Sequence, residues 1–142
     1  MAISVCEVSI TESPLSFPSR GRDLESGAIV DFSGVVRGLE GGREISGIEY
    51  EAHLAMAEHQ LRRIAEEAAD RHGLSKVLIH HRIGFVPAGE ASVIVRVESS
   101  RRLAAFSANQ SIMEELKQLV PIWKRPIFKE KSAENLSVTT HA

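Results

Sequence analysis

Apolar residues recur at helical spacing in the segment that runs from His53 to His72. Steps of three and four residues place them on one face of a helix. Gly73 follows directly, at the position where a residue in the left-handed conformation commonly ends a helix. The pattern therefore predicts a helix over 53–72 whose buried stripe comprises Leu54, Ala57, Leu61, Ile64 and Ala68.

A second helix is predicted from about Arg101 to Leu119. Ser99 or Ser100 can cap its amino end, because a serine hydroxyl accepts a hydrogen bond from a free backbone N–H of the first turn. Pro121 ends it, since proline lacks the N–H that a further turn requires. The predicted apolar stripe comprises Leu103, Phe106, Met113, Leu116 and Val120.

Short stretches of alternating apolar and polar residues predict strands. They are Val5–Ile10, Ala28–Arg37, Ile45–Glu51, Lys76–Ile83, Ala91–Glu98 and, as an edge strand, Ile122–Lys129. The glycines of Gly38–Arg43 predict a mobile or sharply turned loop, across which the second and third strands are expected to pair. Ser13–Arg22 and Phe85–Glu90 have the composition of loops and turns. Two helices against a mostly antiparallel sheet make the predicted fold class α+β.

The length and composition indicate one domain over residues 1–142, with a polar and flexible tail from about residue 131. A chain of this size buries roughly 70% of its unfolded surface, which is enough for a single core. The net charge of −2 provides no global field for nucleic acid, so we expect no nucleic-acid partner. Any anion site must come from a local cluster of cations.

The first residues and the cysteine content indicate a compartment. The start lacks a basic segment followed by an apolar run, and no stretch reaches the length of a membrane span. Cys6 is the single cysteine, which excludes an internal disulfide and a cluster of thiolate metal ligands. We therefore expect a soluble, cytoplasmic protein with no membrane partner.

The pair Arg101-Arg102 follows Ser99-Ser100 at the junction between a predicted strand and a predicted helix. Free N–H groups and the positive end of the helix dipole suit a phosphate at such a junction, and arginine adds bidentate donors. The alternative interpretation is that the pair only solubilises the first turn. Because arginine in a first turn opposes the helix dipole, its presence mildly favours a functional role.

Lys117, Lys124 and Arg37 are further candidates. Lys117 lies in the last predicted helical turn, Lys124 lies just beyond Pro121, and Arg37 ends a predicted strand. Each has a simple structural explanation, as a complement to the helix dipole or as a solvated strand end. If they converge with Arg102, the crowded positive charges disfavour protonation of an amine, which could then take a proton or attack a carbonyl carbon. The sequence alone leaves that convergence open.

The histidines give little support for a metal site. His80 and His81 point to opposite faces of a predicted strand, and His53 and His59 do not align on one helical face. The chain also lacks the glycine-rich phosphate loops and the Gly-x-Ser-x-Gly nucleophile motif. We expect no metal and no cofactor.

Short motifs follow one another between about residues 28 and 128. They are Phe32-Ser-Gly-Val-Val-Arg37, Ile48-Glu-Tyr-Glu51, His81-Arg-Ile-Gly84, Gly89-Glu90, Arg102-x-x-x-Phe106 and Leu116-Lys117-x-x-x-Pro121-Ile-Trp-Lys-Arg125. Each is weak alone, but the ordered set is specific. In this order and spacing the motifs resemble the MoaE family, the large subunit of molybdopterin synthase.

The resemblance implies an α/β-hammerhead fold and a homodimer core within a heterotetramer. Each large subunit would bind a small ubiquitin-like sulfur carrier of the MoaD type, whose C-terminal Gly-Gly thiocarboxylate enters a pocket of this chain. The implied reaction transfers two sulfurs to cyclic pyranopterin monophosphate (precursor Z) and yields molybdopterin for molybdenum cofactor biosynthesis. A neighbouring subunit would help to complete the pocket.

The resemblance also implies roles for individual residues. Lys117 and Lys124 match the family's two active-site lysines. Arg37, with Val35 and Val36 before it, matches a strand end that contacts the substrate.

Other matched positions concern the pterin pocket and the partner. Arg102 matches the arginine of a His-Arg pair in the pterin and phosphate pocket, and Arg125 is assigned to the same pocket. Phe32 matches an aromatic residue near the partner's tail. Arg101 stands where the family has His, and Pro126 where it often has Glu. Arginine keeps the positive charge but does not titrate near neutral pH, so proton transfer would fall more heavily on the lysines.

Two classes of function stay open. The first is a sulfurtransferase in which the two lysines act as an acid/base or nucleophilic pair. The second is a non-catalytic paralogue that binds a ubiquitin-like tail or an anionic nucleotide. The retained lysines favour the enzyme. Because the chain ends in Thr140-His141-Ala142 and not in Gly-Gly, we expect sulfur to arrive from another protein.

Overall fold

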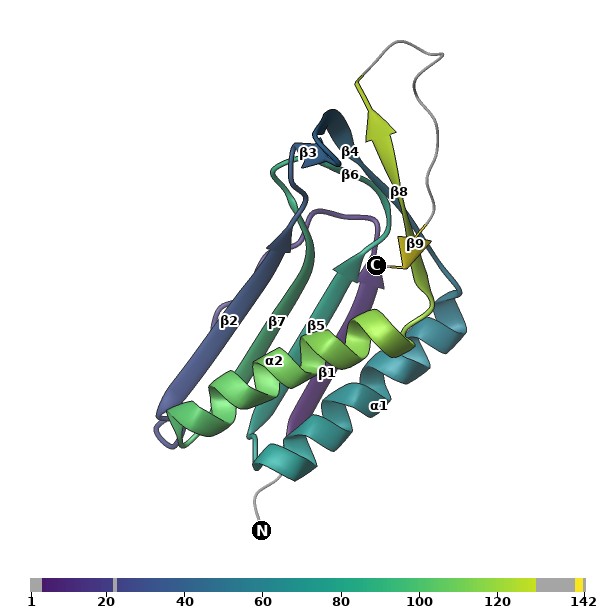
Figure 1. Cartoon of the computed structure of the whole chain (residues 1–142). Coiled ribbons are helices and arrows are strands. Elements are labelled where there is room, and N and C mark those ends of the chain that lie inside the picture. Colours follow the sequence, from purple (N-terminus) through teal and green to yellow (C-terminus); the bar gives the residue numbers. More distant parts are fainter. Residues whose placement is uncertain (1–3, 22, 130–139, 142) are drawn as a thin grey trace.

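The fold consists of two helices and two sheets in the computed structural model, which describes residues 4–21, 23–129 and 140–141 (Figure 1). The helices are α1 (Leu54–His72) and α2 (Arg102–Leu119). The strands are β1 (Val5–Thr11), β2 (Ala28–Val35), β3 (Leu39–Glu40), β4 (Arg43–Ala52), β5 (Lys76–Arg82), β6 (Gly84–Pro87), β7 (Ala91–Ser99), β8 (Ile122–Phe128) and β9 (Thr140–His141).

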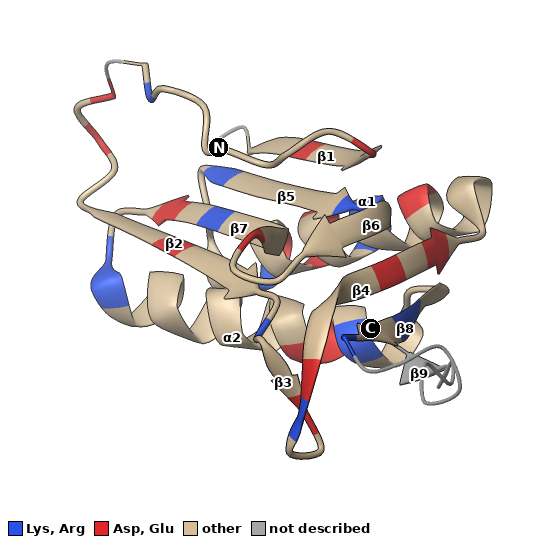
Figure 2. Ribbon diagram, turned by 90° about the horizontal axis from the view of Figure 1, so that it is seen from above, with Lys and Arg blue, Asp and Glu red and all other residues tan. Residues whose placement is uncertain are grey.

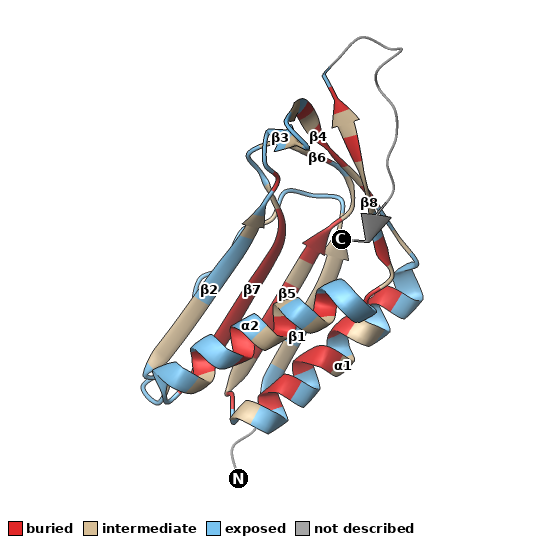
Figure 3. Cartoon of the chain, viewed as in Figure 1, coloured by how far each residue is buried: buried red, intermediate tan, exposed pale blue. Residues whose placement is uncertain are grey.

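The main core lies between the helices and a four-stranded sheet with the order β1-β5-β7-β2. β1 runs parallel to β5, whereas β5, β7 and β2 are antiparallel neighbours. Both helices cover the same face, α1 over β1 and β5 and α2 over β7 and β2 (Figure 1). The buried residues of each helix follow a stripe along it (Figure 3). The predicted α+β class, with two helices on a mostly antiparallel sheet, is confirmed.

The second sheet has the order β3-β4-β8-β9, with β6 also paired to β4. The predicted pairing of Ala28–Arg37 with Ile45–Glu51 is wrong, because β2 pairs with β7 while β4 pairs with β3, β6 and β8. Gly41 and Gly42, with φ values of 58° and 80°, make a tight turn between β3 and β4. The glycine-rich segment therefore forms a short hairpin of its own.

Part of the turn predicted at Phe85–Glu90 is a strand. β6 covers Gly84–Pro87 and pairs with β4, and the chain turns only at Ala88 and Gly89. Gly89 has a φ of 93°, which other residues rarely adopt. A four-residue strand bounded by glycine and proline has too little alternation to be recognised in the sequence.

α1 confirms the predicted helix. His53 precedes it, and its side chain accepts a hydrogen bond from the Met56 N–H at 3.3 Å. Gly73, with a φ of 64°, occupies the left-handed position after the last turn. Most of the predicted stripe is buried, but Leu54 is exposed.

The buried face of α2 differs from the predicted stripe. Leu103 and Phe106 are 76% and 61% exposed. The serine cap is also wrong, because Arg101 occupies the N-cap and the Ser99 hydroxyl accepts a hydrogen bond from the Arg101 N–H. The residues that α2 buries are Ala105, Ala108, Asn109, Ile112 and Leu116.

The opposite face of the four-stranded sheet carries a buried arginine under an irregular segment. Arg96 of β7 donates to the two carboxylate oxygens of Asp31 at 2.7 and 2.8 Å. It also donates to the Pro18 carbonyl at 2.8 Å, and its guanidinium lies 4.9 Å from the centre of the Phe17 ring. Residues 13–21, which we call the covering segment, thus lie on the side of the sheet away from α2 (Figure 2).

The last described strands follow α2. β8 confirms the strand predicted at Ile122–Lys129, but it lies between β4 and the two-residue β9 and not at an edge. The flexible tail predicted from about residue 131 falls largely on residues 130–139 and 142, which lie outside the described residues. Within the described ranges, neither helix is long and apolar enough to cross a membrane.

Candidate functional site

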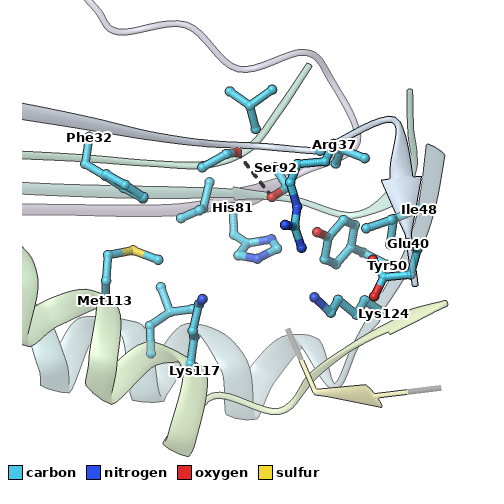
Figure 4. A pocket seen from close by; sticks show the side chains of 15 residues that line it. Phe32, Arg37, Glu40, Ile48, Tyr50, His81, Ser92, Met113, Lys117 and Lys124 are labelled. Atoms are coloured by element: carbon cyan, nitrogen blue, oxygen red, sulfur yellow. Dashed lines mark hydrogen bonds between the residues drawn. The ribbon is translucent and has the colours of Figure 1, made fainter. Parts of the chain in front are cut away.

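A cleft of about 270 Å³ lies where the carboxyl end of α2, the end of β2 and the strands β4 and β8 meet (Figure 4). β2 and α2 belong to the main core, whereas β4 and β8 belong to the second sheet. The cleft therefore lies at the junction of the two sheets.

Lys117 and Lys124 extend into this cleft from different elements (Figure 4). Lys117 lies in the last turn of α2 and is exposed, and Lys124 is half-buried in β8. Between them the helix ends at Val120, Pro121 redirects the chain, and β8 begins. This break in the helix allows one short segment to supply both amines.

Arg37 reaches the cleft from the end of β2, together with Val35 and Val36. The Val36 N–H donates to the Glu90 carbonyl at 3.0 Å, and the Val36 carbonyl accepts from the Gly89 N–H at 2.8 Å. These bonds fix the strand end, and Arg37 directly after it is exposed.

Positive charge predominates in the cleft. Among the described residues that line it, Arg37, Lys117 and Lys124 are cationic and Glu40 is anionic. Three positive charges minus one negative charge give +2, whereas the whole chain has a net charge of −2. The remainder of the chain therefore carries −4, and the cleft is a local cationic site within an acidic protein.

His81 and Tyr50 also line the cleft, although the sequence did not single them out as site residues. Their rings meet edge to face, with 5.3 Å between the centroids. Burial lowers the pKa of His81 from 6.5 to about 4, and its hydrogen bond to the Arg82 carbonyl offsets part of that effect. Burial raises the pKa of Tyr50, and a hydrogen bond with Ser92 partly offsets this. Both side chains are therefore neutral near pH 7.

An apolar groove of about 500 Å³ adjoins the cleft and runs between β2 and α2. Phe32, Met113 and Lys117 line both the cleft and the groove. Phe106, which α2 leaves exposed, lines the groove as well. The groove thus collects apolar side chains that the core does not bury.

Three predicted site residues lie outside this cleft. Arg101 and Arg102 lie at the opposite end of α2, about four turns or roughly 22 Å along the helix from Lys117. Arg125 lines a small hollow with Glu49 and other residues of β4 and β8, and its Nε is buried without a hydrogen-bond partner among the described residues. Strand alternation explains this position, because neighbours in β8 point to opposite faces.

The fold and the cleft define an α+β protein with a small, positively charged cleft. Two amines and a guanidinium surround a cavity with a neutral polar floor, so the site can hold anionic groups and exchange protons with them. Within residues 4–21, 23–129 and 140–141, no group of three or more His, Cys, Asp or Glu is arranged to hold a metal ion.

Comparison with known proteins identifies the family. The family model described as MoaE protein matches residues 10–119. A Thermoplasma volcanium protein named molybdopterin synthase catalytic subunit is 39% identical over 125 residues, which cover 86% of this chain and 91% of that protein. A protein of the same name from Oryza sativa subsp. indica is 41% identical over 109 residues, which cover 77% of this chain but only 56% of the rice protein.

A solved structure agrees with these relatives. The X-ray crystal structure of molybdopterin synthase from Staphylococcus aureus aligns with a TM-score of 0.82 and 31% identity. The alignment covers 94% of this chain and 96% of that one. This chain belongs to the MoaE protein family.

Proposed function

We propose that this chain is the catalytic subunit of a molybdopterin synthase and that it acts in the cytoplasm. It would convert cyclic pyranopterin monophosphate to molybdopterin in two transfers, each taking one sulfur from the thiocarboxylated C-terminus of a small ubiquitin-like partner. The observation that carries the proposal is the gathering of Arg37, Lys117 and Lys124 in one cleft beside an apolar groove.

Both proposed ligands are anions, and the net charge of the cleft suits them. The pterin phosphate and the partner's thiocarboxylate would repel one another in free solution. A cavity with excess positive charge lowers that repulsion and holds the reacting groups together, which favours a reaction between them. Arg37 suits the phosphate, because a guanidinium offers paired donors to two oxygens.

In this proposal Lys117 and Lys124 form the acid/base or nucleophilic pair. An ammonium next to the thiocarboxylate can stabilise negative charge at its carbonyl oxygen while water adds to the carbonyl carbon and the sulfur leaves on the pterin. The second amine can exchange a proton with the pterin. Lys117 enters the cleft from a helix and Lys124 enters it from a strand, so each amine can contact a different reacting group.

The apolar groove offers a path for the tail of the partner, with Phe32 at its junction with the cleft. Terminal glycines carry no side chain, so a bare backbone can enter a narrow cavity. Cys6 is a poor alternative source of sulfur. It lies in β1, and burial raises the pKa of its thiol, which reduces the reactive thiolate form.

The arginines outside the cleft enter the proposal differently. Arg101 and Arg102 are too distant to serve the cleft of their own chain, so a second copy in a homodimer core would supply them. They would then add charge for the phosphate. The role of Arg125 as a substrate ligand stays a prediction, because Arg125 lines a separate small hollow that shares Lys124 with the cleft.

The Lys117→Ala variant tests the proposal. Loss of the amine should reduce formation of molybdopterin by at least about 100-fold, the usual contribution of a positioned acid or base. Folding should persist because Lys117 is exposed, and the small partner should still bind through the rest of the apolar groove. Lys129→Ala removes an exposed lysine outside the cleft and is the matched control. Full activity of Lys117→Ala would disprove the mechanism.

The same assay separates the enzyme from a non-catalytic binding module. The wild-type chain is incubated with the thiocarboxylated partner and the pterin precursor, and sulfurated pterin is measured by mass spectrometry. An enzyme yields molybdopterin. A chain that binds both ligands and yields no sulfurated pterin is a binding module.

A further inference from the structure

One buried side chain presents a hydrogen-bond acceptor to the cleft. His81 is 2% exposed, and its ring points into the cavity (Figure 4). Its Nδ1 lies 2.8 Å from the Arg82 carbonyl oxygen. A carbonyl oxygen can only accept, so the proton of the neutral ring is on Nδ1 and Nε2 carries a lone pair. No hydrogen bond of Nε2 is found among the residues that the structure describes, and Nε2 is not one of their buried atoms without a partner, so it stays open to the cavity.

This arrangement makes His81 an acceptor and not a donor on the cleft side. Burial keeps the pKa of His81 at about 4, so the ring stays neutral at physiological pH. Nε2 opens onto the cleft, so water can donate to it when no ligand is bound. A ligand that displaces this water must supply a donor in its place, or Nε2 loses its hydrogen bond.

The chemistry of the cleft indicates which ligand atom would lie there. Phosphate and carboxylate oxygens carry lone pairs themselves, so they would be repelled by Nε2 and attracted to Lys117, Lys124 and Arg37. An uncharged N–H group matches Nε2. The cavity therefore separates two kinds of ligand group, with anionic oxygens among the cations and an N–H donor against the histidine.

We propose that His81 is a specificity-determining residue whose Nε2 accepts a hydrogen bond from an N–H group of a ligand in the cleft. The identity of the ligand rests on the proposed function. That function supplies two sources of the same chemistry, a ring N–H of the pterin and a peptide N–H of the partner's tail. The contact would orient the part of the ligand that lies deepest in the cleft, next to Tyr50.

Substitutions at His81 can remove the acceptor and preserve its surroundings. His81→Asn keeps a donor close to the Arg82 carbonyl but is too short to replace Nε2. His81→Gln can place its amide oxygen near the position of Nε2 and should restore part of the interaction. His80→Asn is the matched control, because His80 lies on the other face of β5 and contacts Glu7 at 2.9 Å.

Calorimetric titration with cyclic pyranopterin monophosphate, and separately with the carboxylate form of the partner, distinguishes the two sources. His81→Asn should weaken one of these ligands by about 10- to 100-fold, because a ligand donor is left without its acceptor. A change in the pterin Kd and KM, with a smaller change in kcat, assigns the pterin N–H. A change in the partner Kd assigns the peptide N–H. His81→Gln should recover part of the loss, and His80→Asn should behave as wild type.

Other outcomes overturn the inference. It fails if folded His81→Asn binds both ligands and turns over as wild type does, a result that leaves the proposed function intact. It also fails if His80→Asn loses as much affinity. A wild-type chain that neither binds the pterin nor forms product refutes the proposed function and this inference with it. If His81→Asn does not fold, comparison of His81→Gln with His81→Phe decides in the same way, because only glutamine retains an acceptor.

Discussion

At the scale of residues, one step along a strand separates two histidines into different environments. His80 is half-buried and contacts Glu7, while His81 is buried beside Tyr50. The difference arises because neighbouring side chains of a strand point to opposite faces. Burial of His81 has a consequence for stability, since a buried imidazole resists protonation and an imidazole in the unfolded chain does not.

The free energy of unfolding should fall as the pH is lowered from about 6.5 to about 4, the ordinary and the folded-state pKa of His81. In that window the unfolded chain binds a proton at this residue and the folded chain does not. The loss approaches roughly 3 kcal/mol at the acidic end and is absent above the window. Urea denaturation across this pH range measures how steeply the free energy of unfolding changes with pH in wild type and in His81→Asn. The dependence should be less steep in His81→Asn.

The matched control for this titration is His80→Asn, which should retain the steep pH dependence of the wild type. If wild type and His81→Asn lose stability in parallel, groups other than His81 account for the acid sensitivity.

The sequence identified the cationic residues of the cleft but not the neutral residues Tyr50 and His81 that also line it. Lys117, Lys124 and Arg37 were found through ordered motifs, and the structure brings them together. Tyr50 and His81 lie within two of the same motifs but received no role, because they belong to strands of different sheets. Which strand faces meet follows from tertiary packing and not from local pattern. Polar residues at inward-facing strand positions were the available signal.

At the scale of elements, local signals predicted the elements better than their partners. The apolar period and Gly73 were sufficient for α1, because both act within one helix. The pairing of β2 with β4 was wrong, because β3 uses the glycine turn and β7 takes the available edge of β2. In α2 the predicted buried stripe consisted of large apolar residues. Alanines face the core instead, and Phe106 faces the groove.

Gly47 permits the close approach of β6 to β4. A Cβ on Gly47 would overlap the Val86 carbonyl oxygen and lie 2.6 Å from an atom of the Phe85 ring. Because Gly47 is also paired with β8, the strand has little freedom to move away. Gly47→Ala should reduce the free energy of unfolding by at least about 2 kcal/mol, measured by urea denaturation.

Gly38→Ala is the control for that substitution, because a Cβ there would meet no atom within 4 Å and its φ is not positive. It should change the free energy of unfolding by less than about 0.5 kcal/mol. Equal effects of the two substitutions would show that steric overlap at Gly47 is relieved without cost.

At the scale of the whole molecule, separate layers must pack before the cleft exists. β2 and α2 provide one side and β4 and β8 the other, while the covering segment closes the far face of the main sheet. Arg96 links that segment to β7 and β2 through Pro18 and Asp31. Arg96 is 6% exposed and Asp31 is exposed, so only the guanidinium side of these hydrogen bonds is shielded from water.

Arg96→Met should release the covering segment and destabilise the fold by about 2–3 kcal/mol, because the Pro18 carbonyl and the Asp31 carboxylate lose their donor. Hydrogen exchange should quicken in residues 13–21 before other regions. Arg63→Met is the control, since it removes only contacts within α1, an exposed pair with Glu67 and hydrogen bonds to Gln60, and should cost less than about 1 kcal/mol. Unchanged exchange in residues 13–21 would contradict the anchoring role of Arg96.

The contrast between a cleft of +2 and a remaining charge of −4 has a kinetic consequence. Negatively charged molecules meet net repulsion from the rest of the chain and attraction at the cleft. This electrostatic steering increases the fraction of collisions that reach the cleft. Dissolved salt shortens the reach of both fields to about 8 Å at physiological strength, so capture should slow as ionic strength rises.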